Sequence, residues 1–154
     1  MKRAQVLAHV VTGSKNIKVT IQGNQAFRRP GLINLPNGDF SNPEWVCMTQ
    51  GWIDHELGHE DETCHKVTKQ ACVESKVLNG FRQIIEDVRM ERSRGIKFPG
   101  ARLNLNKLAE LAIKRKLFTD PTNHNTGQLV SSMCLYVNLY LKLIHDLHLK
   151  LIHP

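Results

Sequence analysis

One octapeptide constrains this chain more than any other segment: residues 52–59 read Trp-Ile-Asp-His-Glu-Leu-Gly-His. Histidines four residues apart lie one turn from each other on a single face of a helix. A glutamate directly follows the first histidine, so it can reach a water molecule held near both imidazoles. The segment therefore predicts a helix on which His55, Glu56 and His59 approach one metal ion.

The pattern His-Glu-x-x-His is typical of zinc sites in which two imidazoles share the ion and the glutamate acts on its bound water. We therefore expect Zn²⁺ as the cofactor, His55 and His59 as metal ligands, and Glu56 as the catalytic base. Gly58, between the two histidines, is expected to leave space near the metal.

Catalytic zinc usually takes three protein ligands, and two residues compete for the third position. Glu86 is favoured, because it lies on a second predicted helix that can pack against the first. His65 is the alternative, since the chain from His55 reads His-Glu-x-x-His-x-x-x-x-x-His, the metzincin spacing. That spacing usually needs a glycine midway between the later histidines, where Glu62 stands here.

Three charged residues are expected to orient these ligands by contacting them on the side away from the metal. Arg89, one turn after Glu86, can hold the Glu86 carboxylate, while Asp54 and Asp87 can accept the free N–H of a ligand histidine. A surface ion pair of Glu86 with Arg82 or Arg89 is the competing interpretation.

The predicted fold class is α+β, a mostly helical domain with a small N-terminal sheet. Residues 17–21 alternate apolar and polar side chains with β-branched apolar positions, which predicts a half-buried strand. Residues 32–35, between Pro30-Gly31 and Pro36-Asn37-Gly38, predict a second short strand that can pair with the first.

The metal-binding histidines fall on a helix predicted at about 43–60. Asn42 is a suitable N-cap, and Pro43 fits the first helical position. Ile53 and Leu57 can then face the core.

Two further helices and a closing helix complete the predicted fold. Apolar residues recur at helical intervals over about 67–94, where Asn79-Gly80 can break or bend the helix. A helix of about 104–117 follows a possible Asn104 cap. We expect one domain over residues 1–128, with an amphipathic C-terminal helix in 129–154 packed on it.

The net charge of +7 is concentrated in residues 82–116, which carry ten Lys or Arg against four Asp or Glu. Such a stretch can meet nucleic acid or an acidic partner, but a solvated helical surface is favoured because no recognition motif accompanies the charge. The basic start of the chain lacks the long apolar stretch of a secretory signal, so we expect a cytoplasmic protein with no membrane segment.

Three segments together resemble a family of gluzincin-like metallopeptidase domains that includes the CobT subunit of cobaltochelatase and phage-encoded CobT-like proteins. They are Gly51–His59 with Thr63 four residues beyond, Ile85–Glu91, which is similar to the family's Glu-Asp-x-Arg-x-Glu segment, and Gly31–Pro36. The resemblance covers about residues 25–95. It implies a zincin-like fold, Glu86 as the third ligand and, for a phage-encoded protein, the host cytoplasm as the location.

The chain departs from this family in two respects. The family often has an asparagine shortly before the glutamate, whereas Asn79 precedes Glu86 by seven residues. Many members continue into a von Willebrand factor A domain that works with an AAA+ ATPase, and the sequence given shows none.

The expected function is therefore zinc-dependent hydrolysis of peptide bonds, with a protein or peptide substrate held as an extended strand beside residues 32–35. The alternative is a non-hydrolytic, CobT-like metal-binding adaptor of an AAA+ ATPase in a chelatase or phage complex. A weaker third hypothesis is nucleic-acid binding through residues 82–116.

Overall fold

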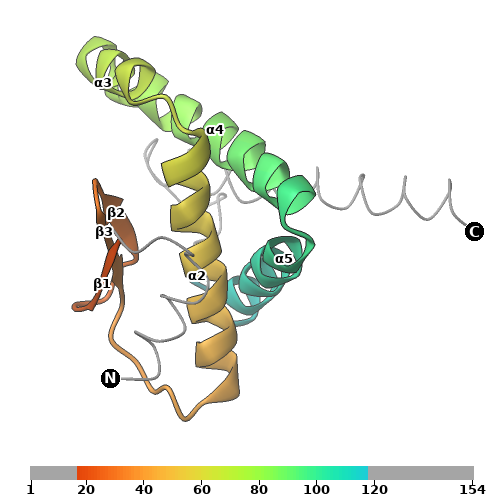
Figure 1. The fold of residues 1–154 in the computed structure, drawn as a ribbon. Coiled ribbons are helices and arrows are strands. Elements are labelled where there is room, and N and C mark those ends of the chain that lie inside the picture. The colour runs from red at the N-terminus through yellow and green to blue at the C-terminus, as the bar shows by residue number, and fades with distance from the viewer. Residues whose placement is uncertain (1–16, 118–154) are drawn as a thin grey trace, which may run out of the picture. The chain divides into compact units, whose positions relative to one another are not determined.

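The computed structural model describes residues 17–117, which form the expected α+β fold (Figure 1). The domain boundary expected near residue 128 and the C-terminal helix expected in 129–154 lie outside the described residues. The elements are the strands β1 (Lys18–Ile21), β2 (Phe27–Arg29) and β3 (Leu32–Leu35) and the helices α2 (Pro43–Glu62), α3 (His65–Glu74), α4 (Lys76–Lys97) and α5 (Pro99–Lys114).

The chain divides into two compact units. Within the described residues, the first contains residues 17–63 together with Arg89–Lys114, and the second contains Cys64–Val88 and residues 115–117. Helix α4 is continuous through the boundary between Val88 and Arg89. The first unit therefore holds the sheet, α2, the second half of α4, and α5.

The sheet has the strand order β1-β3-β2, with β1 parallel and β2 antiparallel to β3. The two predicted strands are confirmed and pair with each other, while β2 was not predicted. Because β3 has a neighbour on each side, residues 32–35 present no free edge. The prediction that an extended substrate pairs with residues 32–35 is therefore wrong, since strand addition needs an unpaired edge.

A buried asparagine organises the turn-rich connection between β1 and β2. The side chain of Asn34, only 2% exposed, donates to the backbone oxygens of Gln22 and Gln25, each at 2.9 Å. Its Oδ1 accepts from the Thr20 hydroxyl at 2.9 Å. These bonds satisfy a polar side chain that the core would otherwise exclude.

Helix α2 begins as the sequence predicts. The Asn42 side chain accepts a hydrogen bond from the Glu44 backbone N–H at 2.9 Å, and Pro43 occupies the first position. The helix extends two residues beyond the predicted end, to Glu62, and Thr63 closes it by donating its backbone N–H to the His59 carbonyl at 3.2 Å.

Helix α2 lies between the sheet and α5 (Figure 1). On the sheet side, Ile53 and Leu57 join Ile33 and Leu35 in one buried apolar cluster. On the α5 side, Gly51 lets the helices approach closely: a Cβ added there would lie 2.5 Å from Leu108 Cβ. Burial on both sides fixes the direction in which α2 presents its remaining face.

The segment predicted as one helix over 67–94 is two helices, α3 and α4, and the break falls at Ser75. The Ser75 carbonyl accepts from the Asn79 backbone N–H at 2.9 Å, and its hydroxyl oxygen accepts from the Leu78 N–H at 3.4 Å. Ser75 thus starts α4, and Asn79-Gly80 remains inside that helix, so the break predicted at Asn79-Gly80 was misplaced.

Helix α5 begins at Pro99, five residues before the predicted Asn104 cap. The Phe98 carbonyl accepts from the backbone N–H groups of Ala101 and Arg102, at 2.9 and 3.3 Å. Proline fits this first position because its missing N–H would have no helical acceptor there. The Asn104 cap was therefore a wrong prediction, and Leu111 and Ala112 lie on the buried side of the helix.

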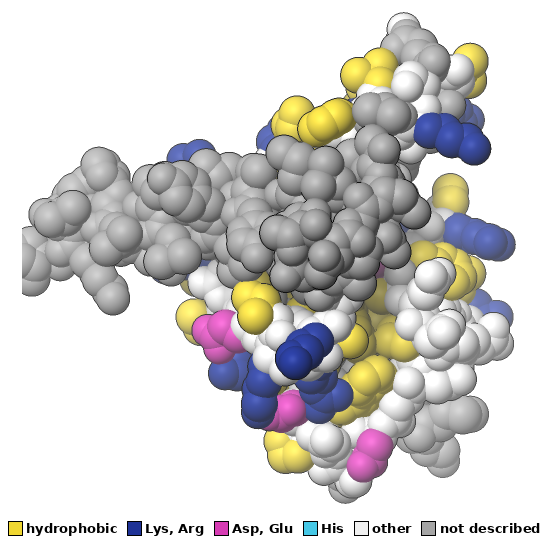
Figure 2. Space-filling view, turned by 180° about the vertical axis from the view of Figure 1, so that it is seen from behind, with side chains coloured by type: hydrophobic (Ala, Val, Ile, Leu, Met, Phe, Trp, Pro, Cys, Tyr) yellow, Lys and Arg dark blue, Asp and Glu magenta, His cyan; other side chains and the backbone are white. Residues whose placement is uncertain are grey.

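Ion pairs involve much of the basic stretch 82–116. Lys107 pairs with Glu110 along α5, Lys114 reaches Glu44 on α2, and Lys97 reaches Glu62. On the face shown in Figure 2, Lys and Arg side chains are interspersed with acidic and hydrophobic ones. Among the helices of residues 17–117, none combines the length and apolar character that a membrane span requires.

Candidate metal centre

The two histidines of α2 face each other through the same ring atom. Nε2 of His55 and Nε2 of His59 are 3.2 Å apart, and the two ring planes are nearly perpendicular, at 85°. Both side chains are half-buried. The spacing of four residues therefore brings two imidazole nitrogens to one point, as the sequence predicts.

The other ring nitrogen of each histidine contacts an oxygen atom. Nδ1 of His55 lies 3.0 Å from Oε1 of Glu91 on α4, and Nδ1 of His59 lies 2.9 Å from the Thr63 hydroxyl. An ionised carboxylate only accepts hydrogen bonds, so His55 carries its proton on Nδ1. With this tautomer, Nε2 of His55 is an acceptor. The Thr63 hydroxyl can either accept from or donate to His59 Nδ1, so two tautomers of His59 fit the geometry: one with an unprotonated Nε2, and one whose Nε2–H donates to His55 Nε2.

This arrangement fits a divalent metal. Two imidazole nitrogens bound to one tetrahedral zinc, each at about 2.0–2.1 Å, lie roughly 3.3 Å apart. The 3.2 Å between the two Nε2 atoms matches that separation. Ligand histidines also usually donate their second N–H to a carboxylate or another oxygen, as both can do here.

A carboxylate of α4, that of Asp87, lies near this pair of histidines. Ligand atoms of His55, His59 and Asp87 lie within 4.8 Å of one another, forming the metal-capable group found within residues 17–117. Asp87 is one turn before Glu91 on the same continuous helix, so both carboxylates share one helix face. Asp87, expected from the sequence to orient a ligand, is thus one of three residues whose atoms could hold a metal ion, and its role stays a prediction.

Glu86, the favoured third ligand, does not belong to this group. Neighbouring residues on a helix point about 100° apart, since a turn takes 3.6 residues. Glu86 and Asp87 therefore present their carboxylates in different directions, and the assignment of Glu86 as a ligand stays a prediction.

The alternative ligand His65 is the first residue of α3, and its side chain lies outside the described part of the structure. The metzincin pattern needs an abrupt turn at the position of Glu62. Glu62 is instead the last residue of α2, and within residues 17–117 the only non-glycine residue with positive φ is Lys116. The backbone therefore makes no left-handed turn at residue 62.

Glu56, the expected catalytic base, is 7% exposed and directly follows His55 on α2. The carboxylate is thus largely removed from bulk solvent, and its role as the catalytic base stays a prediction.

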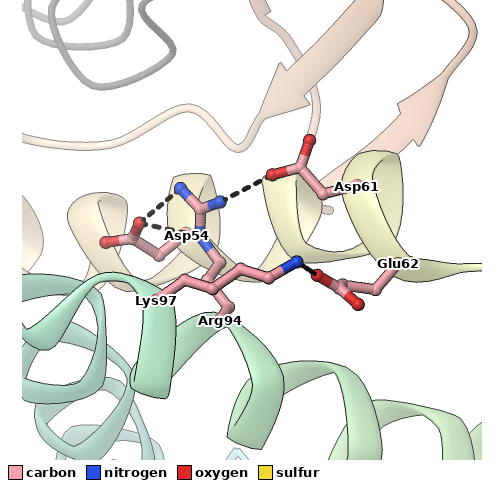
Figure 3. A network of polar contacts seen from close by, with 5 residues as sticks. All are labelled: Asp54, Asp61, Glu62, Arg94 and Lys97. Atoms are coloured by element: carbon pink, nitrogen blue, oxygen red, sulfur yellow. Dashed lines mark hydrogen bonds and ion pairs between the residues drawn. The ribbon is translucent and has the colours of Figure 1, made fainter.

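Asp54 does not orient a histidine, contrary to the prediction. Its Oδ1 accepts from Arg94 Nε and Nη2 at 3.1 and 3.0 Å, and its Oδ2 accepts from Asn104 at 2.8 Å. Arg94 also donates to Asp61 at 3.1 Å (Figure 3). Asp54 thus ties α2 to α4 and α5, and Glu91 and Thr63 contact the histidines.

Arg89 was expected to hold Glu86. One of its guanidinium nitrogens donates to the backbone carbonyl of Glu62, and another lies 3.9 Å from the Glu62 carboxylate. Lys97 contacts the same carboxylate (Figure 3). Arg89 therefore fastens the C-terminal end of α2, and a contact with Glu86 stays a prediction.

Sequence reasoning assigned no roles to Glu91 and Arg94 and gave Gly58 a wrong one. A Cβ added at Gly58 would lie 2.0 Å from Met90 Sδ, so this glycine admits α4 and does not make space for a metal. A usable signal was the spacing of Asp87 and Glu91, two carboxylates four residues apart on one helix. No protein-family model, curated protein or solved structure that was compared with this chain matches it.

Proposed function

We propose that this chain is a zinc-dependent metallopeptidase with a zincin-like active-site helix. The proposal is carried by one observation: the Nε2 atoms of His55 and His59 lie 3.2 Å apart. Their Nδ1 atoms contact Glu91 and Thr63. Two unprotonated nitrogens at this distance repel each other unless a cation or a proton lies between them.

The surroundings of the pair favour zinc among the divalent ions. Two imidazoles and one carboxylate form the three-residue ligand set of several zinc hydrolases, and that set leaves one coordination position for a reactant. Asp87 provides the carboxylate in this proposal, with Glu86 as the alternative from the same helix. Imidazole also suits copper, iron and nickel, so metal analysis has to include those ions.

Zinc at such a site would polarise a substrate carbonyl and lower the pKa of bound water. The part played by this chain's own residues is proton transfer and orientation. Glu56 takes a proton from the attacking water onto its carboxylate and passes that proton to the leaving amine nitrogen. His55 and His59 keep their Nε2 atoms directed inward because Glu91 and Thr63 engage Nδ1.

The decisive test combines metal content with hydrolysis. Purified protein is analysed by inductively coupled plasma mass spectrometry and incubated with an unstructured protein substrate. We expect about one zinc per chain, loss of the metal in His55→Ala and His59→Ala, and cleavage of the substrate by the wild-type protein. Glu56→Gln should keep the metal and lose cleavage by at least about 100-fold, since general-base catalysis contributes about 10²–10⁴-fold.

The same experiment separates the hydrolase from the adaptor. Metal bound through His55 and His59 without cleavage of any unstructured substrate, together with co-purification of an AAA+ ATPase, would favour the non-hydrolytic adaptor. Wild-type protein that holds no divalent metal would contradict both functions.

A further inference from the structure

Glu91 on α4 has no role in the hydrolysis proposed above except through His55. Its carboxylate Oε1 lies 3.0 Å from His55 Nδ1, and its side chain is 11% exposed against 23% for His55. The two residues are 36 positions apart in the sequence. A carboxylate this well buried, brought to one imidazole by a separate helix, is costly to place unless it is hydrogen-bonded there.

Contacts on both sides of Glu91 hold it in this position. The preceding residue, Met90, is fully buried and lies in the space left open by Gly58 of α2. Arg94, nearly one turn later, bridges Asp54 and Asp61 of α2 (Figure 3). The two attachments fix the second half of α4 along α2, so the carboxylate cannot withdraw from His55 without disturbing buried packing and ion pairs.

We propose that Glu91 is a positioning residue of the metal centre, which accepts the Nδ1–H of His55 and so keeps Nε2 of that ring unprotonated and turned toward the metal. The inference rests on the proposed metal site, and it adds the residue that sets the tautomer and basicity of one ligand. An anionic acceptor makes the opposite ring nitrogen a stronger electron-pair donor than a neutral acceptor does.

The two histidines are therefore held unequally. His55 is oriented by a carboxylate from another helix, whereas His59 is oriented by Thr63, a neutral hydroxyl four residues along the same chain segment. Hydrogen bonds to ionised groups are roughly twice as strong as neutral ones. Losing Glu91 should thus weaken metal binding more than losing the Thr63 hydroxyl.

The test measures zinc affinity of the apo protein by competition with a chromophoric chelator at one fixed pH. For Glu91→Ala we expect about 10–100-fold weaker binding, the usual cost of removing such a partner. Glu91→Gln, whose amide oxygen still accepts the Nδ1–H, should recover part of that loss, and Thr63→Val should lose less than Glu91→Ala. Glu110→Ala, which removes an exposed carboxylate on α5, is the matched control and should bind zinc as the wild type does.

A Co²⁺-substituted sample adds a second measurement, the d–d absorption spectrum. Glu91→Gln should keep the wild-type spectrum, because the coordinating atoms are unchanged. If both Glu91 variants bound zinc as tightly as wild type, the inference would fail while the hydrolase proposal stood. If Glu91→Gln bound as weakly as Glu91→Ala with an altered Co²⁺ spectrum, Glu91 would be a direct ligand and the positioning role would be overturned. Wild-type protein without a zinc site would remove the proposed function as well.

Discussion

The two halves of α2 are buried by different chemistry. In the first half, apolar contacts dominate: Met48 is fully buried, and Gly51 lies against Leu108 of α5. In the second half, Ile53 and Leu57 stay in the apolar cluster, but polar contacts with other elements are added, since Asp54 and Asp61 bind Arg94 of α4. Three further residues of this half make such contacts: His55 with Glu91, Glu60 with Arg28, and Glu62 with Lys97.

This difference separates stability from orientation. Apolar burial is proportional to area and non-directional, so it holds the helix without fixing the angle of any one side chain. Hydrogen-bonded ion pairs are directional, and those of the second half determine where Glu91 and the histidines point. The proposed metal centre includes residues of the directional half, where an error of position would misplace a ligand.

The largest expected effect is that of Arg94→Met, which breaks the polar half. Arg94 and Asp54 side chains are 6% and 4% exposed, so the variant leaves a buried carboxylate with Asn104 as its remaining partner. Removing one partner of a buried ion pair typically costs about 3–5 kcal/mol. Urea unfolding should show that loss.

Arg92→Met, which removes an equal charge from an exposed position of the same helix, should stay within about 0.5 kcal/mol of the wild type. Asp54→Asn combined with Arg94→Met should recover part of the stability, since no unpaired carboxylate then remains at position 54. Equal losses in Arg94→Met and Arg92→Met would show that the polar half contributes no more than surface charge does.

A medium effect is expected from adding one methyl group to each half. Gly51→Ala and Gly58→Ala gain the same helical preference, about 0.5–1 kcal/mol. The new Cβ at position 51 would meet Leu108 Cβ at 2.5 Å and the Asn104 backbone oxygen at 2.9 Å, whereas at position 58 it would meet Sδ and Cγ of Met90, a flexible but fully buried side chain. We expect Gly51→Ala to lose about 1–3 kcal/mol net and Gly58→Ala to lose less.

Thermal unfolding of the two alanine variants measures this difference directly. Because both variants gain the same helical preference, the difference between their free energies of unfolding reports the cost of packing the added methyl group. A larger loss at position 58 than at position 51 would mean that α4 is packed more rigidly on α2 than α5 is.

The smallest effect concerns pH. Lys97 donates a hydrogen bond to Glu62, and this bond is the main reason why the pKa of Glu62 lies below its ordinary value of 4.5. A carboxylate with a lowered folded-state pKa stabilises the fold above its ordinary pKa, and this contribution is lost as the pH falls through the folded-state value. Lys97→Met should therefore make stability less dependent on pH just below 4.5. Identical acid profiles for the variant and the wild type would contradict this origin of the shift.

The parts of the fold that depend on neighbouring residues could be predicted from the sequence. Asn42 and Pro43 are local signals that predict the start of α2. A spacing of four residues on a helix is enough to predict that His55 and His59 lie together. The class α+β and the strands at residues 17–21 and 32–35 followed from the same kind of local pattern.

The parts that depend on distant residues could not be predicted. The strand β2 has three residues and exists through its pairing with β3, and its Arg28 is held by Glu60. The contact of Glu91 with His55 and that of Arg94 with Asp54 depend on how α4 packs along α2. A local pattern also misassigned Asn104, whose side chain binds Asp54 in place of capping a helix.

The central claim is that two imidazole nitrogens of α2 meet at one metal ion, and anomalous diffraction at the zinc absorption edge tests it most directly. Crystals of zinc-loaded protein should show an anomalous peak about 2.0–2.1 Å from Nε2 of His55 and of His59, with a carboxylate of α4 as a further ligand. A peak bound elsewhere, or rings whose Nε2 atoms point away from each other around no ion, would contradict the account.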